Sequence, residues 1–115
     1  MAQKAFSPTR RSPRFAPRRP VTVAISHGGV PTAYGVVMNL SESGACLQTG
    51  MVPRQRELEM MLSFFDGVYV QAKGRVVWSD PGEGLASVGV EFTSISPVDR
   101  KSLSETLVAP AFDPV

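Results

Sequence analysis

The chain is poor in the residues that most often build catalytic or metal centres. Its 115 residues include one cysteine, Cys46, and one histidine, His27. A lone cysteine excludes an intrachain disulfide, and no cluster of side chains has the spacing of metal ligands. The chain also lacks a Gly-x-Ser-x-Gly nucleophile elbow and a glycine-rich phosphate loop. We therefore expect no enzyme, no resident metal and no cofactor.

Long hydrophobic runs are also missing. No apolar stretch approaches the length needed to span a bilayer, although 43% of the residues are hydrophobic, as in a globular domain. The basic pairs Arg10-Arg11 and Arg18-Arg19 are followed by Pro20 and a short β-branched stretch. That stretch is not the apolar core of an export signal. We expect a cytoplasmic protein with no membrane insertion.

Acidic residues are absent from the first twenty positions. This segment holds six of the 12 basic residues, which leaves six basic and ten acidic residues in the rest of the chain. The net charge of +2 therefore conceals a positive N-terminal arm on an acidic body. An anion-binding function is expected on the arm.

Alternating apolar residues from Val21 onward predict six short strands. We expect them at residues 21–26, 33–40, 45–48, 58–64, 68–78 and 88–92. Asp66-Gly67 marks a hairpin between the fourth and fifth strands, and Gly74 marks a bend within the fifth. Ser96-Pro97 begins a helix, with Leu103 and Leu107 on its apolar side. Cys46 is expected as a small core residue, and Trp78 is expected to pack at a barrel end.

These elements predict an all-β fold with one terminal helix. A closed six-stranded antiparallel barrel is favoured over a sandwich, because closure leaves no exposed strand edge. Three prolines make residues 10–20 unsuited to a helix or a central strand. We expect a flexible basic arm at residues 1–20, the barrel and helix at residues 21–109, and a tail at residues 110–115.

The first of two short motifs is Arg10-x-x-x-Arg14 on the arm. The planar fork of an arginine matches the O6 and N7 acceptors of guanine, and it also binds phosphate through charge-assisted hydrogen bonds. Two arginines four residues apart lie roughly 13 Å apart on an extended chain. They could clamp a base and a phosphate together. Arg11 is a further candidate for ligand contact or electrostatic support.

The second motif is Asn39-x-Ser41-x-x-Gly44. The Asn39 amide offers both a donor and an acceptor to a guanine edge. Ser41 lies two residues on, which would place its hydroxyl on the same strand face. Gly44 permits a positive φ and a close approach of ligand to backbone. Together the two motifs predict a pocket for an anionic, guanine-like ligand.

Both motifs, followed by Gly89-Val90-Glu91-Phe92, resemble the bacterial PilZ domain family over about Arg10 to Leu107. The resemblance implies a six-stranded antiparallel barrel with a C-terminal helix, and a receptor for the bacterial second messenger cyclic di-GMP. It implies that the ligand-binding residues include Arg10, Arg14, Asn39, Ser41 and Gly44.

The function expected from this resemblance is that of a single-domain cyclic di-GMP receptor. The arm would fold onto the barrel when ligand binds, and an unidentified protein effector would recognise the changed surface. Motility, biofilm or exopolysaccharide control are the outputs that the resemblance implies. One alternative is a PilZ-like adaptor that binds only protein. Another is a small nucleic-acid-binding barrel, against which the acidic body argues, so no DNA or RNA partner is expected.

Overall fold

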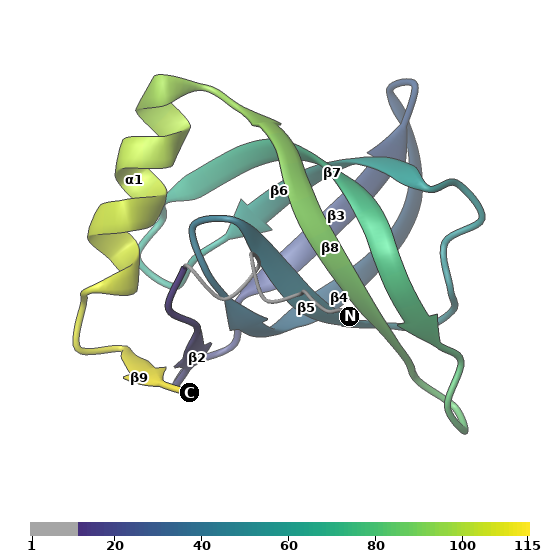
Figure 1. Ribbon diagram of the computed structural model, residues 1–115, viewed down its shortest axis with the longest axis horizontal. Helices are drawn as coiled ribbons and strands as arrows, with labels where there is room; N and C mark the ends of the chain where they lie inside the picture. The colour runs from purple at the N-terminus through teal and green to yellow at the C-terminus, as the bar shows by residue number, and fades with distance from the viewer. Residues whose placement is uncertain (1–11) are drawn as a thin grey trace, which may run out of the picture.

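The computed structural model describes residues 12–115, and its central feature is a closed barrel (Figure 1). The strands are β2 (Phe15–Pro17), β3 (Thr22–His27), β4 (Val30–Leu40), β5 (Gly44–Thr49), β6 (Glu57–Ser63), β7 (Tyr69–Asp80), β8 (Ala86–Ile95) and β9 (Phe112–Pro114). Six of them follow the order β3-β6-β7-β8-β5-β4, and a pairing between β3 and β4 closes the ring. Every pairing is antiparallel. The predicted six-stranded antiparallel barrel is confirmed.

Alternation along the strands fills the barrel interior. In β7, Val70, Ala72, Gly74 and Val76 are buried, while the residues between them are exposed. The pairing of β7 with β8 shifts register between Lys73 and Gly74, the position at which a bend was predicted. A Cβ atom on Gly74 would press on the side chains of Val90 and Met60. A glycine therefore allows the strand to bend inward over the core.

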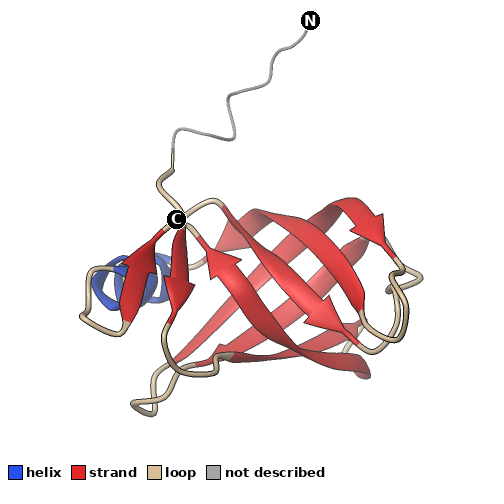
Figure 2. Cartoon of the chain, turned by 90° about the horizontal axis from the view of Figure 1, so that it is seen from below, coloured by secondary structure: helices blue, strands red, loops and turns tan. Residues whose placement is uncertain are grey.

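The single helix among residues 12–115, α1 (Pro97–Leu107), covers one end of the barrel (Figure 2). Ser96 caps it, because its Oγ accepts a hydrogen bond of 3.1 Å from the Asp99 backbone N–H. Leu103 and Leu107 are buried against the barrel core, as their spacing predicted. Within residues 12–115, no helix has the length and apolarity that a membrane span requires.

Two three-residue strands were not predicted from the sequence. Residues 15–17 of β2 pair with residues 112–114 of β9, and Phe15 also pairs with Leu40 in β4. The Arg18 guanidinium lies 2.8 Å from the Asp113 carboxylate. This contact raises the pKa of Arg18 and, chiefly through the hydrogen bond, lowers that of Asp113. Parts of the expected arm and tail thus form a short ribbon beside the helix (Figure 2).

The ribbon is anchored by an aromatic cluster. Phe112 is buried, and its ring centre lies 6.1 Å from those of both Phe64 and Phe65. The Arg19 guanidinium lies over Phe65, 5.5 Å from the ring centre. These contacts join residues almost fifty positions apart, so no local sequence pattern could predict them. Pro17 and Pro114 fit at the ends of such a short edge ribbon, where few backbone N–H groups are needed.

Candidate ligand-binding site

The two sequence motifs meet where the chain enters the barrel. Nη1 of Arg14 donates a hydrogen bond of 2.7 Å to Oδ1 of Asn39, 25 residues further along the chain. The backbone brings them together, because the β2–β4 pairing joins the residues that follow each of them. The Arg14 carbonyl also accepts a 3.0 Å hydrogen bond from the N–H of Val115. Arg10 and Arg11 lie outside the described residues.

Asn39 begins a row of paired residues that crosses four strands, which we call the cross-strand row. Asn39 in β4 pairs with Cys46 in β5, and Cys46 pairs with Gly89 in β8. Gly89 in turn pairs with Trp78 in β7. Three steps between strands span roughly 14 Å. The row is therefore polar at the Arg14 end and aromatic at the other.

A pocket of about 290 Å³ lies over this row. Its lining residues are Arg14, Asn39, Ala45, Cys46, Val77, Trp78, Gly89 and Val90. The predicted placement of Cys46 in the core was wrong, because the side chain is half-buried and lines the pocket. Its strand position points outward, between the buried residues Ala45 and Leu47.

Trp78 lies on the outer face of the barrel rather than packed at its end. The residue is 48% exposed, and its indole ring lies against Gly89 so closely that a Cβ atom on Gly89 would collide with it. A register shift between Val76 and Trp78 leaves both Val77 and Trp78 exposed. Strict alternation along β7 predicted an inward-facing Trp78, and the register shift is the reason that this prediction was wrong. Because Gly89 has no side chain, the Trp78 ring can pack directly against the backbone of β8.

Ser41 lies in the turn after β4 rather than on the strand face beside Asn39. The chain reverses there, and the Ser41 N–H donates a 2.8 Å hydrogen bond to the Gly44 carbonyl. The Ser41 hydroxyl is buried and accepts hydrogen bonds from the N–H groups of Ser43 (3.1 Å) and Gly44 (3.2 Å). Such side-chain-to-backbone bonds stabilise a tight turn. Ser41 thereby fixes the loop that follows Asn39.

Gly44 is buried and allows two strands to approach closely. It pairs with Glu91, and a Cβ atom on it would press on the Val90 carbonyl oxygen. Its φ is not positive, unlike that of Gly67 in the β6–β7 hairpin. The expected reason for this glycine, a left-handed turn, was therefore wrong. Close contact between β5 and β8, two residues along the strands from the cross-strand row, is the reason that the structure gives.

A family model described as PilZ domain matches residues 8–109. The chain belongs to the PilZ domain family. A search of curated protein sequences found no match.

Two solved structures share the fold of this PilZ domain. The PilZ domain with c-di-GMP of YcgR from Escherichia coli is 13% identical, with a TM-score of 0.68 over 84% of this chain and 87% of that one. The Bacillus subtilis inhibitor of motility, MotI/DgrA, is 15% identical, with a TM-score of 0.68 over 86% of this chain. The match covers 49% of the B. subtilis chain, so this PilZ domain spans about half of its length.

Burial and charge oppose one another at the Cys46 thiol of this PilZ domain. Desolvation raises its pKa, and the nearby Arg14 guanidinium partly offsets the rise. The thiol is therefore protonated at neutral pH and acts as a small, weakly polar surface in the pocket. Among residues 12–115, no group of three or more His, Cys, Asp or Glu side chains is placed to hold a metal ion.

The sequence motifs predicted one end of this site and missed the other. Arg14 and Asn39 were expected together and are bonded to one another. Trp78 and Gly89 were not expected in the site, although an aromatic residue opposite a strand glycine is a recognisable pairing once the register is known. The register shift after Val76 is what concealed it.

Proposed function

We propose that this PilZ domain is a receptor for cyclic di-GMP, and that the dinucleotide binds over the cross-strand row. The hydrogen bond between Arg14 and Asn39 carries the proposal, because it joins the two motifs at one pocket. The likeness in fold to a YcgR structure described with c-di-GMP supports the choice of ligand.

The two ends of the row suit different parts of the ligand. The Arg14 guanidinium has five N–H donors and uses one on Asn39, so others are available to a guanine edge or a phosphate. Every base has a flat π-face that can stack on an aromatic ring, an interaction worth about 1–3 kcal/mol. Trp78 offers such a ring at the other end. One guanine would stack there while Arg14 holds an acceptor.

The remaining motif residues have separate roles in this proposal. A pocket of about 290 Å³ is at the small end of ligand sites and suits one base with its sugar. We assign the phosphates and the second base to Arg10 and Arg11, whose charges suit an anionic ligand. Ser41 and Gly44 act by fixing the turn and the strand spacing beside Asn39, because the Ser41 hydroxyl is buried and already bonded.

The single tryptophan makes the proposal easy to test, because Trp78 is the chain's only indole fluorophore. Titration with cyclic di-GMP should change its emission in a saturable way, since a base stacks on or beside the ring. Cyclic di-AMP should bind at least about tenfold more weakly, because adenine carries an N6 donor where guanine has the O6 acceptor that arginine needs. Fluorescence titrations with both dinucleotides measure the two affinities.

A short single-stranded oligonucleotide completes the comparison. Saturation by the oligonucleotide and not by cyclic di-GMP would assign the basic arm to nucleic acid. No response to any of the three ligands, with none detected by calorimetry either, would favour an adaptor that binds only protein. Binding of cyclic di-AMP as tight as that of cyclic di-GMP would contradict guanine recognition by Arg14.

We further propose that ligand binding orders the arm and is communicated to a protein partner through the β2–β9 ribbon. Arg14 immediately precedes β2, and its carbonyl accepts a hydrogen bond from the N–H of Val115, the residue that follows β9. The Arg18–Asp113 ion pair joins the same two segments. A ligand that fixes Arg14 therefore also fixes residues 112–115. The likeness to an inhibitor of motility supports motility as one output of such a partner.

Asp113→Asn should weaken cyclic di-GMP binding by about two- to fivefold, because an exposed ion pair makes a small but measurable contribution. The pKa of Asp113 is lowered by Arg18, so the pair is intact at neutral pH and is lost only as the pH falls below the ordinary range of aspartate. Calorimetry at neutral pH measures the change. Glu105→Gln, which removes the same charge from the exposed side of α1, should leave the affinity unaltered. Equal affinities for wild type and Asp113→Asn would mean that the β2–β9 ribbon is not coupled to ligand binding.

A further inference from the structure

An extra residue in β7 decides which way Trp78 faces. Val76 pairs with Val90 in β8. Trp78, two positions further on, pairs with Gly89, which is adjacent to Val90. Val77 is therefore the additional residue of a β-bulge, an irregularity that re-aims side chains near binding sites. Because opposite residues of an antiparallel pair lie on the same face, the bulge places the indole on the outer face with Gly89.

Without the bulge, Trp78 would turn into the barrel. Regular pairing would set Val77 opposite Gly89. It would set Trp78 opposite Val88, which is fully buried in the core. The indole would then point away from the pocket, and the smaller side chain of Val77 would take its place over Gly89. The aromatic end of the cross-strand row therefore exists only while the bulge is held.

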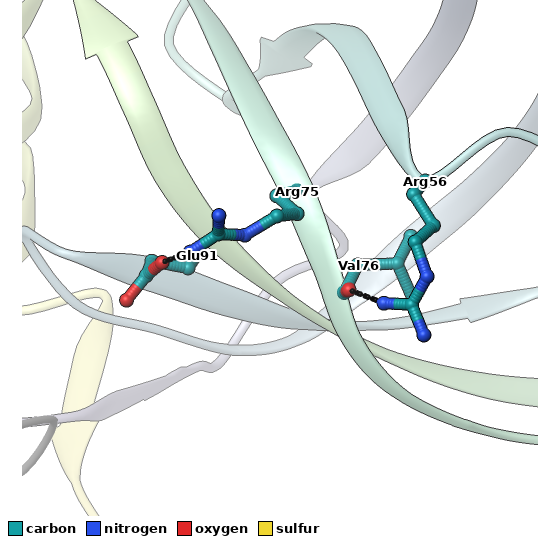
Figure 3. Close-up of polar contacts among 4 residues, drawn as sticks. All are labelled: Arg56, Arg75, Val76 and Glu91. Atoms are coloured by element: carbon teal, nitrogen blue, oxygen red, sulfur yellow. Dashed lines mark hydrogen bonds and ion pairs between the residues drawn. The ribbon is translucent and has the colours of Figure 1, made fainter.

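Support for β7 from the β6 side ends at the same point. The last pair between the two strands is Glu57 with Arg75. Arg56, immediately before β6, forms two hydrogen bonds with the next residue of β7. The Val76 N–H donates to the Arg56 carbonyl at 2.7 Å, and Nη1 of Arg56 donates to the Val76 carbonyl at 3.1 Å (Figure 3). Val76 is thus held at both of its backbone polar groups, one residue before the bulged position.

Figure 3 shows two arginine contacts of unlike strength just before the bulge. Arg75 lies 2.7 Å from the Glu91 carboxylate of β8, but the two side chains are 53% and 39% exposed. An ion pair so open to water contributes little to holding a register. The Arg56 side chain instead bonds the backbone carbonyl of Val76, which is buried, and a buried carbonyl left without a partner is costly. Of the two arginines, Arg56 therefore does more to hold the bulge.

We infer that Arg56 is a positioning residue for the Trp78 end of the pocket. Its guanidinium holds Val76, where the bulge begins, and the bulge keeps the indole over Gly89, where a base can stack. Arg56 does not line the pocket, so it acts through Trp78 rather than on a ligand. The inference rests on the proposed function for its ligand, cyclic di-GMP, but the orientation of the indole can be measured without any ligand.

Nuclear magnetic resonance of the free protein tests the positioning step. The indole Nε1 is the atom nearest to the place that a Cβ on Gly89 would occupy, so the indole N–H should show a strong nuclear Overhauser effect to the Gly89 α-protons. Arg56→Met keeps an unbranched stem, removes every donor and should largely abolish this effect. Arg54→Met removes the same charge from an exposed position two residues earlier and should leave it as in wild type. An undiminished effect in Arg56→Met would overturn the inference.

Calorimetry with cyclic di-GMP tests the consequence for binding. Arg56→Met should raise the dissociation constant at least about fivefold, the lower end of the cost of losing one stacked base. A double-mutant cycle shows how Arg56 acts, because in a Trp78→Ala background the Arg56→Met change should cause no further loss. Losses that add would mean that Arg56 acts on the ligand directly or elsewhere, and they would overturn the inference. An unchanged affinity in Arg56→Met would overturn it as well.

The two measurements separate this inference from the proposed function. Wild type that does not bind cyclic di-GMP would reject the receptor, while the nuclear Overhauser effect would still decide whether Arg56 orients the indole. Because Arg56 is exposed, its replacement leaves the core intact, and circular dichroism should show the same barrel in every variant. If Arg54→Met reproduced the losses of Arg56→Met, the charge of the loop and not the bond to Val76 would be responsible, which would contradict the inference.

Discussion

Arg14→Ala should raise the dissociation constant for cyclic di-GMP by roughly 30-fold or more. Truncating one partner of a charged, hydrogen-bonded pair at an interface typically costs about 2–5 kcal/mol. Arg14 both lines the pocket and bonds Asn39, so its loss would remove the proposed ligand contact and free the Asn39 amide. Isothermal titration calorimetry measures the affinity, and circular dichroism should show the same barrel before and after the change.

Arg19→Ala is the matched control for this experiment. It removes the same charge from the same segment, but Arg19 lies over Phe65 and does not line the pocket. We expect an affinity within a few-fold of wild type, because only long-range attraction is lost. Similar losses in the two variants would mean that the arm acts through its net charge alone and that Arg14 has no specific role.

Gly44→Ala should lower the free energy of unfolding by about 1–3 kcal/mol, the usual cost of inserting a methyl group into a close-packed site. The added Cβ meets the Val90 carbonyl oxygen, which is backbone and has little freedom to move. Urea denaturation of both proteins measures the difference. The affinity for cyclic di-GMP should fall too, because widening the gap between β5 and β8 displaces Cys46 and Gly89 in the cross-strand row.

Gly50→Ala provides the comparison for this glycine. A Cβ atom on Gly50 meets nothing within 4 Å, and its φ is not positive. The free energy of unfolding of Gly50→Ala should stay within about 0.5 kcal/mol of that of wild type, as for most surface substitutions. If Gly44→Ala proved equally harmless, β5 and β8 would not need their close contact, and another reason would be required for the glycine of this motif.

Local patterns in the sequence were enough to predict most of the barrel. Val70, Ala72 and Val76 alternate with exposed residues because a strand has one wet face, and that period is visible without any tertiary information. Asp66-Gly67 gave the hairpin, in which Gly67 has a φ of 84°. The β2–β9 ribbon has no such signal, since three residues are too few to show a period and Phe112 finds its partners almost fifty positions away.

In the candidate site, too, local features could be predicted from the sequence and long-range pairings could not. Arg14 and Asn39 could be named because their chemistry suits an anionic guanine ligand and their motifs are short and local. Trp78 entered the site only through its pairing with Gly89, which depends on a register shift that residue types do not reveal. Ser41 was named for its hydroxyl, and the structure uses that hydroxyl inside the turn. Residue identity led to the hypothesis of an anionic guanine ligand, whereas pairing between distant strands determined which groups line the pocket.

The central claim is that one ligand engages both ends of the cross-strand row, and chemical-shift mapping with cyclic di-GMP tests it most directly. Adding the dinucleotide to isotopically labelled protein should shift the Arg14 and Asn39 side-chain signals at one end of the row. It should also shift the Trp78 indole N–H and the Gly89 amide at the other, together and with one apparent affinity. Shifts confined to other strands, or no shifts at saturating dinucleotide, would contradict the account.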